Sequence, residues 1–192
     1  MLISKAKQTL KFIRVKILVL NAPFELMDLP SRKDIMITQV TFDNLTAITD
    51  FRSKDILPTF RDFLEEGDIG VYAYRNSKVV GHLWGKVCRQ ESCRVHGYFD
   101  IARDEALILY GNVSEDCRGL RIFESMMITL CHLLFSKAKV SRILADPWVD
   151  NVPSWKGILK VGFKQDGVGT YIQFGHILVF RHISKMDKCS NK

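Results

Sequence analysis

The spacing of apolar positions predicts several strands in the first half of the chain. Residues 34–42 (DIMITQVTF) alternate apolar and polar positions, as a half-buried strand does. Two apolar runs at 69–74 and 78–89, separated by a short polar turn, predict a β-hairpin. Residues 92–101 extend this meander, and the near-continuous apolar run at 105–113 predicts one more strand.

Helical spacing appears between and after these strands. Asp43 or Asn44 can cap a helix to about Phe51, and a second helix is expected from Pro58 to Glu66. Residues 119–136 then carry an apolar stripe at helical spacing, which we interpret as core packing. The stripe consists of Ile122, Met126, Met127, Leu130, Leu133 and Leu134.

The last third of the chain alternates between the two periods. Residues 141–148 predict a strand, and Asn151 is positioned to cap a short helix that Gly162 ends. Two further strands are expected at 170–174 and 176–180. This order of strands and helices predicts an α+β fold.

The expected domain covers residues 34–183. Residues 1–33 are interpreted as an N-terminal arm, extended or strand-forming, with an interfacial anchor as the alternative. Residues 184–192 are interpreted as a basic tail. The apolar part of the arm, 12–20, is a candidate for pairing with a second subunit to make a homodimer.

The net charge of +7 is concentrated near the two ends of the sequence. Residues 1–33 carry seven Lys or Arg against two acids, and residues 181–192 carry four against one. Residues 34–180 hold 17 bases and 18 acids. Because the middle of the chain is neutral, we expect no nucleic-acid-binding face in the domain.

Composition excludes several other classes of protein. No apolar run approaches the ~20 residues that cross a bilayer, so stable membrane insertion is not expected. The five cysteines have no metal-binding spacing, and an odd number of them is typical of reduced thiols in the cytoplasm. We expect a cytoplasmic protein without a metal.

The stretch from Val113 to Phe123 carries the clearest chemical signal. A strand ends at Val113, a short turn follows, and Arg118-Gly119-Leu120-Arg121-Ile122-Phe123 leads into a helix. The first amides of a helix lack intrahelical partners and carry the positive end of its dipole, so this turn suits a pyrophosphate. Gly119 permits close backbone approach, and Arg118 or Arg121 can add a charged hydrogen bond.

A second motif follows one strand later. Asn151-Val-Pro-Ser154 precedes Gly162-Phe163 by seven residues. Together the two segments resemble the GNAT superfamily of acyl-CoA N-acyltransferases. Val113, Arg118 and Gly119 match its strand–loop–helix motif, and Asn151, Ser154, Gly162 and Phe163 match its second motif. The resemblance covers about the last 90 residues strongly, and the order of elements before them agrees.

The resemblance implies a three-layer fold. Its central mixed, mostly antiparallel sheet is splayed between the fourth and fifth core strands and has helices on both faces. It also implies acetyl-CoA or another acyl-CoA as the acyl donor. The pantetheine arm is expected along the strand 105–113, and Asn151 is expected to contact the cofactor or hold the splayed strands. The implied cofactor-binding residues are Val113, Arg118, Gly119, Leu120, Arg121, Ile122, Phe123 and Asn151.

The sequence departs from the family pattern in three ways. Arg121 and Phe123 replace the later small residues of the loop, and Ser114-Glu115 replaces a residue and proline. Ile158 stands where the family often has a tyrosine general acid, seven residues after the asparagine. Proton delivery to the CoA thiolate therefore lacks its usual donor.

Two residues of the strand 105–113 are candidate catalytic groups. Glu105 shares a strand face with Val113, near the place where some members of the family have a glutamate base. A solvated carboxylate at the start of a strand is the alternative reading. Tyr110 is a candidate replacement acid, with a packed core tyrosine as its alternative.

Four further residues are candidates for binding the acceptor. Asp146 ends the strand 141–148 at the predicted splay and can bind an amine, although capping the Pro147 turn is equally open. His96 and Tyr98 can line the acceptor site, and Trp84 can stack on a ring of the substrate. For His96 and Trp84, packing roles are the alternative.

These inferences predict an N-acyltransferase. The acceptor is expected to be a primary amine of a small molecule, which attacks the acyl group directly in a ternary complex. The alternatives are a protein or peptide N-acetyltransferase and a non-catalytic module that binds acyl-CoA.

Overall fold

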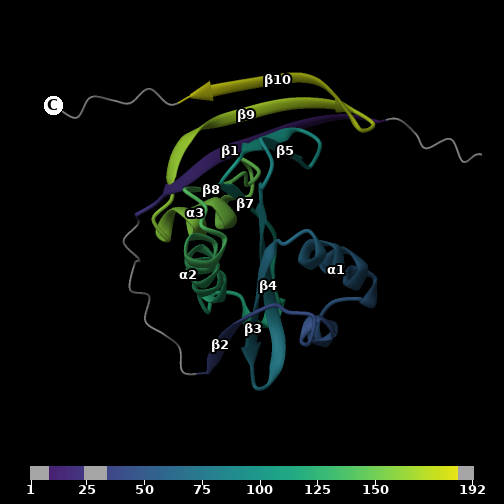
Figure 1. Ribbon diagram of the computed structural model, residues 1–192, viewed down its shortest axis with the longest axis vertical. Coiled ribbons are helices and arrows are strands. Elements are labelled where there is room, and N and C mark those ends of the chain that lie inside the picture. Colours follow the sequence, from purple (N-terminus) through teal and green to yellow (C-terminus); the bar gives the residue numbers. More distant parts are fainter. Residues whose placement is uncertain (1–8, 24–33, 186–192) are drawn as a thin grey trace, which may run out of the picture.

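The structure is a computed structural model that describes residues 9–23 and 34–185. Eight strands form one sheet in the order β10-β9-β1-β8-β7-β4-β3-β2 (Figure 1). The helices are α1 (Leu57–Glu65), α2 (Ile122–Leu133) and α3 (Val152–Lys160). The sheet strands are β1 (Leu10–Asn21), β2 (Ile35–Gln39), β3 (Ile69–Arg75), β4 (Lys78–Val87), β7 (Glu105–Val113), β8 (Arg142–Ala145), β9 (Lys164–Phe174) and β10 (Ile177–Lys185).

One half of this sheet follows the sequence pattern closely. β2, β3, β4 and β7 pair as antiparallel neighbours, and β3 and β4 form the expected hairpin. β7 has the predicted bounds, and residues 106–109 of its apolar run are buried because alternate side chains enter the two apolar cores on opposite faces of the sheet. Residues 45–50 form a 3-10 helix where a helix was expected.

The sheet splays between β7 and β8. These two strands are parallel, and Glu105 to Ile108 pair with Arg142 to Ala145. β7 then continues to Val113, whereas β8 ends at Ala145. The edge of β7 beyond Ile108 is therefore free of β8, as the expected mixed, splayed α+β fold requires.

The N-terminal segment differs from its interpretation as an arm. Residues 10–21 form β1, which lies inside the sheet and pairs antiparallel with both β8 and β9. Val15 and Leu18 are fully buried on opposite faces of this strand. These residues therefore form a strand, as one reading of the segment expected, but the strand belongs to the sheet and not to a separate arm. The expected tail begins within β10, and residues 186–192 lie outside the described chain.

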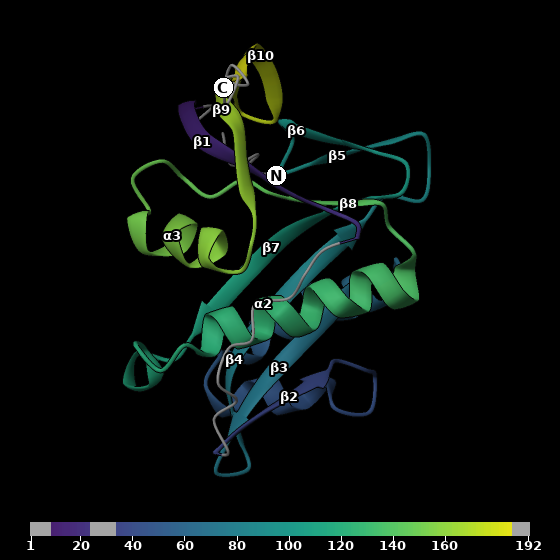
Figure 2. The ribbon, with the colours of Figure 1, turned by 90° about the vertical axis from the view of Figure 1, so that its left-hand side faces the viewer.

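Helices cover both faces of the sheet. α2 and α3 pack on one face, and α1 and the 3-10 turns before it pack on the other (Figures 1 and 2). Each face has its own apolar core. Met126 and Met127 of α2 lie in the first, and Phe60 of α1 lies in the second. The stripe predicted in residues 119–136 is buried against the first core except Leu133, which is only partly buried.

A small second sheet completes the fold. β5 (Ser92–Val95) and β6 (Phe99–Ala102) pair with each other and not with the large sheet. The expectation that residues 92–101 extend the β3–β4 meander is therefore wrong. Asp100 anchors this hairpin by accepting hydrogen bonds from Arg94 and from Arg181 of β10. The anchored hairpin projects its turn, residues 96–97, toward the space left by the splay.

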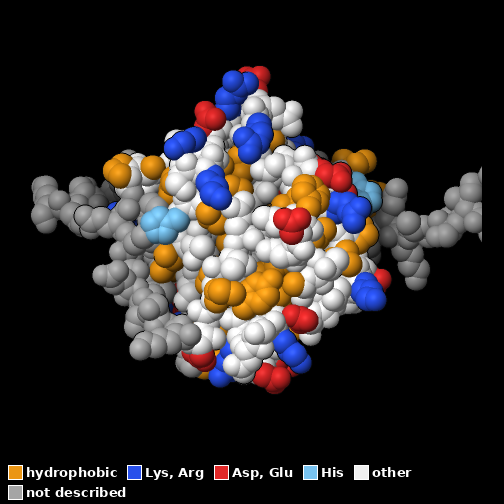
Figure 3. Space-filling model, turned by 60° about the horizontal axis from the view of Figure 1, so that its bottom comes forward, with side chains coloured by type: hydrophobic (Ala, Val, Ile, Leu, Met, Phe, Trp, Pro, Cys, Tyr) orange, Lys and Arg blue, Asp and Glu red, His pale blue; other side chains and the backbone are white. Residues whose placement is uncertain are grey.

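Charge and thiols are distributed as in an ordinary globular domain. On the face shown in Figure 3, Lys and Arg side chains lie among Asp and Glu side chains. The described cysteines, Cys88, Cys93, Cys117 and Cys131, are all free. Cys189 lies outside the described residues. Among the helices described, none has the length and apolar character needed to cross a membrane.

Candidate functional site

The turn before α2 forms an open backbone cradle. After β7, a short 3-10 turn (Glu115–Cys117) leads to Gly119 with φ +76° and Arg121 with φ +58°. Arg121 is the N-cap of α2, and no side chain caps the helix there. A Cβ added to Gly119 would meet no atom within 4 Å. The first amides of α2 therefore face an accessible space that a negative group can enter.

This cradle is one end of a groove of about 470 Å³ between α2, α3 and the free edge of β7. Three cationic side chains line it: Arg118, Arg121 and Lys160. All expected cofactor residues line the groove except Leu120, which packs against the core. Lys160 was not foreseen, although it shares a face of α3 with Pro153 and Gly157, which also line the groove.

Asn151 supports the groove through α3. Its side chain accepts a hydrogen bond from the Ser154 amide at 3.3 Å, as the predicted N-cap does. Asn151 and Ser154 both line the groove. The cap thus fixes the start of α3 beside the β7 edge.

Phe123 stands where the groove meets a second cavity. It lines both, together with Gly111 of β7 and Ser154 of α3. A Cβ on Gly111 would lie 3.1 Å from the Phe123 ring, and one on Gly157 would lie 3.4 Å from it. These two glycines accommodate the aromatic ring that replaces a small loop residue.

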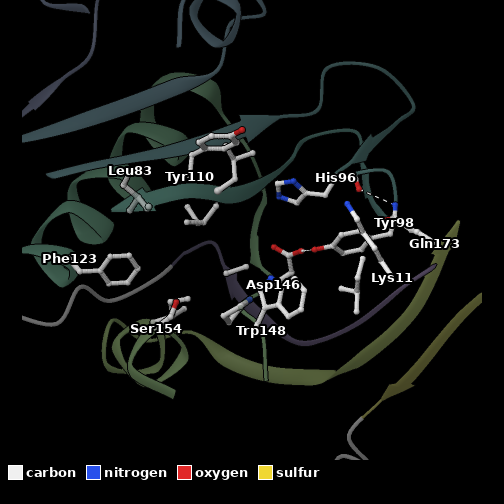
Figure 4. A pocket seen from close by; sticks show the side chains of 17 residues that line it. Lys11, Leu83, His96, Tyr98, Tyr110, Phe123, Asp146, Trp148, Ser154 and Gln173 are labelled. Carbon is white, nitrogen blue, oxygen red and sulfur yellow. Dashed lines mark hydrogen bonds between the residues drawn. The ribbon is translucent and has the colours of Figure 1, made fainter. Parts of the chain in front are cut away.

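The second cavity is an acceptor-sized cleft of about 430 Å³ at the splay (Figure 4). Asp146, the first residue after β8, points into it and accepts a hydrogen bond from the Tyr98 hydroxyl at 3.0 Å. Burial raises the pKa of the Asp146 carboxyl to about 7, although the Tyr98 hydrogen bond lowers it. A carboxylate that titrates near neutral pH in a cleft is typical of general bases.

The β5–β6 turn supplies His96 to the same cleft. Its ring stacks on Tyr98 with centroids 5.9 Å apart, and its backbone oxygen accepts a hydrogen bond from Gln173 of β9 at 3.2 Å. His96 is exposed to the cleft, and the surrounding walls lower the pKa of its imidazole by desolvation. The neutral ring is therefore the favoured form at neutral pH.

Two residues of β1 also line the cleft, Lys11 and Ile13. Lys11 lies on the same side of the cleft as His96 and Tyr98 (Figure 4). Among the described residues, no carboxylate lies within ion-pairing distance of Lys11. The sequence analysis did not identify Lys11 and Ile13 as site residues, because it interpreted residues 1–33 as an arm. The alternation of apolar and polar positions in residues 13–19 was the signal that could have indicated a strand of the domain.

The β4–β7 ladder contains a bulge beside the cleft. Trp84 pairs with Leu109 and His82 with Asn112, so Leu83 faces two residues, Tyr110 and Gly111. Tyr110 has φ +50° and lines the cleft, and its ring packs edge-on to Phe63 of α1 at 5.2 Å. The extra residue interrupts the ladder at the point where groove and cleft meet.

Two expected site residues lie elsewhere. Trp84 is fully buried and packs on Phe60 and Phe63, so its assignment to substrate stacking is wrong. Glu105 lines neither cavity. Its carboxylate pairs with Arg142 at 2.8 Å and accepts a hydrogen bond from the Ala102 amide.

Within residues 9–23 and 34–185, no cluster of His, Cys, Asp or Glu side chains has an arrangement that could hold a metal ion.

No family model matches the sequence. No curated protein matches it either.

Solved structures of acetyltransferases do match the fold. A GNAT-family acetyltransferase from Colwellia psychrerythraea has a TM-score of 0.60 and 16% identity, over 86% of this chain and 56% of that one. A GCN5-related N-acetyltransferase from Kribbella flavida has a TM-score of 0.59 and 12% identity, over 86% and 60% of the two chains. AAC(6')-Iy, in complex with the bisubstrate analogue CoA-S-monomethyl-acetylneamine, has a TM-score of 0.53 and 12% identity, over 68% and 90%.

The chain spans 52–64% of the length of the first five solved structures that it matches. At these identities the likeness is one of fold. The fold of this chain is that of the GNAT acetyltransferases, as its two motifs predicted.

Proposed function

We propose that this chain, which has the GNAT fold, binds an acyl-CoA and transfers its acyl group to a primary amine of a small molecule. The observation that carries the proposal is the continuity of two cavities. A cationic groove with an open glycine turn meets, at Gly111 and Ser154, a cleft that holds a carboxylate titrating near neutral pH.

The groove suits the phosphates of coenzyme A. Unpaired amides at the start of α2, together with Arg118, Arg121 and Lys160, supply hydrogen bonds and positive charge. The free edge of β7 offers backbone groups for the amides of pantetheine. This arrangement directs the thioester toward the junction beside Phe123.

Asp146 is the group to which we assign the base. When bound, the acyl-CoA would supply a thioester: the acceptor nitrogen would form a bond to its carbonyl carbon, and the carbon–sulfur bond would break to release the CoA thiolate. Asp146 takes the proton that the amine loses, and Tyr98 holds the carboxylate in place at 3.0 Å. The bulge at Tyr110–Gly111 is the candidate source of a backbone amide for the thioester oxygen.

The CoA thiolate then needs a proton. Ile158 lies in the cleft at the position where the resemblance expects a tyrosine. Ser154 lines both cavities, whereas Tyr110 lines only the cleft. We therefore assign the proton donor as the Ser154 hydroxyl, which would take up a proton from solvent in the open groove as it donates its own, and Tyr110 is the alternative donor.

Lys11 and Asp146 together favour an acceptor with two charges. Asp146 binds or deprotonates the amine, and the Lys11 ammonium can hold an anionic group of the same molecule (Figure 4). Amino acids and amino sugar phosphates have this character. A protein or peptide N-terminus and a non-catalytic acyl-CoA-binding role remain the alternatives.

An amine panel with acetyl-CoA tests the proposal. The panel contains amino acids, amino sugars, polyamines and short peptides, and release of free CoA is followed. We expect release with at least one small amine and loss of that release in Asp146→Asn. Binding of acetyl-CoA without release for any amine would support the non-catalytic role instead, and release only with peptides would support the protein acetyltransferase.

A further inference from the structure

The structure brings the two basic ends of the sequence together. β1, from the N-terminal region, and β10, from the C-terminal region, lie on either side of β9 (Figure 1). The three strands contain six Lys or Arg residues and a single acid, Asp166. Five of the eleven basic residues counted at the two ends of the sequence therefore lie in two strands that flank the same neighbour.

One face of this layer is apolar and exposed. Residues paired directly across antiparallel strands share a face, so the register defines two rows. Leu10, Phe174 and Ile177 form one row, and Phe12, Ile172 and Phe180 form the next. Leu10, Phe12 and Ile177 are each more than 60% exposed, and Phe174 and Phe180 more than 40%. We call these six residues the apolar patch.

The patch begins where α3 stops covering the sheet. Farther along the same face of β1, Lys16 reaches over the Trp155 ring of α3 at 4.5 Å, and Leu18 is buried in the core. Arg14, between the patch and Lys16, pairs with Thr170, which pairs with His182 of β10. The third row is therefore polar and basic. An exposed group of large side chains with a basic border marks an interaction surface.

We propose that the apolar patch and its basic border bind the surface of an anionic lipid bilayer. Phenylalanine and aliphatic side chains can enter the boundary between headgroups and acyl chains, while Arg14 and His182 remain at the level of the headgroups. This binding is peripheral and does not depend on the acyl-transfer proposal.

A second copy of the chain fits the patch less well. A two-fold dimer would place the same patch on both sides of the interface, so one basic border would face another. The two apolar rows also contain no side chain that can donate or accept a hydrogen bond. Hydrocarbon of lipid requires none, whereas protein interfaces commonly include about one hydrogen bond per 100–200 Å².

Vesicle co-sedimentation of the full chain tests the proposal. Vesicles of phosphatidylcholine alone are compared with vesicles that also contain phosphatidylglycerol. We expect binding to the anionic vesicles that weakens with added salt, and little binding to the neutral ones. Replacing Phe12 and Phe180 together by Ser should lower the partition coefficient at least about tenfold.

Two further variants control the test. Phe42→Ser removes a phenylalanine that is 59% exposed outside the patch, and it should bind vesicles like the unchanged chain. Arg14→Glu keeps the apolar patch but reverses charge at its border, and it should lose binding to anionic vesicles. Equal binding by all variants, or no binding to either vesicle, would overturn the proposal. A dimer in light scattering that the Phe12 and Phe180 replacements dissociate would identify the patch as a subunit interface.

Discussion

The cofactor groove and the acceptor cleft are built from the chain in different ways. The groove takes its lining from two continuous stretches, residues 111–124 and 151–160. The cleft draws on segments scattered from Lys11 of β1 to Gln173 of β9. The two cavities meet at Gly111, Phe123 and Ser154. The groove is therefore formed mainly by residues that are close in sequence, whereas the cleft forms only when strands that are distant in sequence come together in the sheet.

The difference also extends to their chemistry. The groove presents helix amides and three cations, which suit any coenzyme A ester. The cleft combines Asp146, Tyr98, His96 and Lys11, whose positions determine which amine can enter and lose a proton. Variants of the two cavities should therefore separate acyl-CoA affinity from turnover.

The largest separation is expected from Asp146→Asn. Because the side-chain amide of asparagine cannot accept the proton that the acceptor amine loses, kcat/KM should fall about 10²- to 10³-fold. The affinity for acetyl-CoA should stay unchanged. Steady-state kinetics and calorimetry measure the two quantities. A loss of acetyl-CoA binding equal to the loss of rate would contradict the assignment.

The assignment of Asp146 as the base also predicts how the rate depends on pH. Asp146 acts as a base only when ionised, so kcat/KM should rise as pH increases through about 7.

The free energy of unfolding should change in the opposite direction with pH. The folded-state pKa lies above the ordinary value of 3.8, so the carboxyl costs stability as pH rises from there to about 7. Asp146→Asn should therefore be at least as stable as the unchanged chain at pH 8 in thermal unfolding.

Arg121→Glu together with Lys160→Glu is expected to have the opposite effect, a loss of acetyl-CoA affinity with little change in the KM for the amine. Reversing two charges beside the open turn should weaken acetyl-CoA binding about 10- to 100-fold. The KM for the amine should change little. Arg61→Glu together with Lys54→Glu, at exposed positions on and just before α1, makes the same change of net charge and should behave as the unchanged chain. If the control weakens binding as much, the effect is one of net charge and not of the groove.

A smaller effect, confined to the acceptor, is expected from Lys11→Gln. The KM for an amine that carries an anionic group should rise about tenfold, whereas that for a neutral amine of similar size should not change. Acetyl-CoA binding provides the internal control. Equal effects on both amines would exclude a specific role for Lys11.

The smallest effect is expected at the junction of the two cavities. Phe123→Ala removes the ring held between Gly111 and Gly157, so longer acyl chains should gain access. The ratio of octanoyl to acetyl transfer should rise about three- to tenfold. Competition between the two donors measures this ratio, and an unchanged ratio would show that Phe123 does not limit acyl length.

The sequence predicted the parts of the fold and site that depend on near neighbours. The turn at Gly119, the Asn151 cap and the strand 105–113 are local features, and local patterns are sufficient to find them. β1 was missed as a core strand because its partners, β8 and β9, lie more than 100 residues away in sequence. Lys11 reaches the cleft only because β1 lies inside the sheet. Trp84 is buried because its face of β4 is the one that packs against α1. Neither contact can be inferred from near neighbours in sequence.

Calorimetry with acetyl-CoA measures whether the groove binds the acyl donor. We expect saturable binding of one acetyl-CoA per chain, competed by free CoA and weakened by Arg121→Glu with Lys160→Glu but not by Asp146→Asn. Absence of binding by acetyl-CoA and by longer acyl-CoAs would contradict the proposed function.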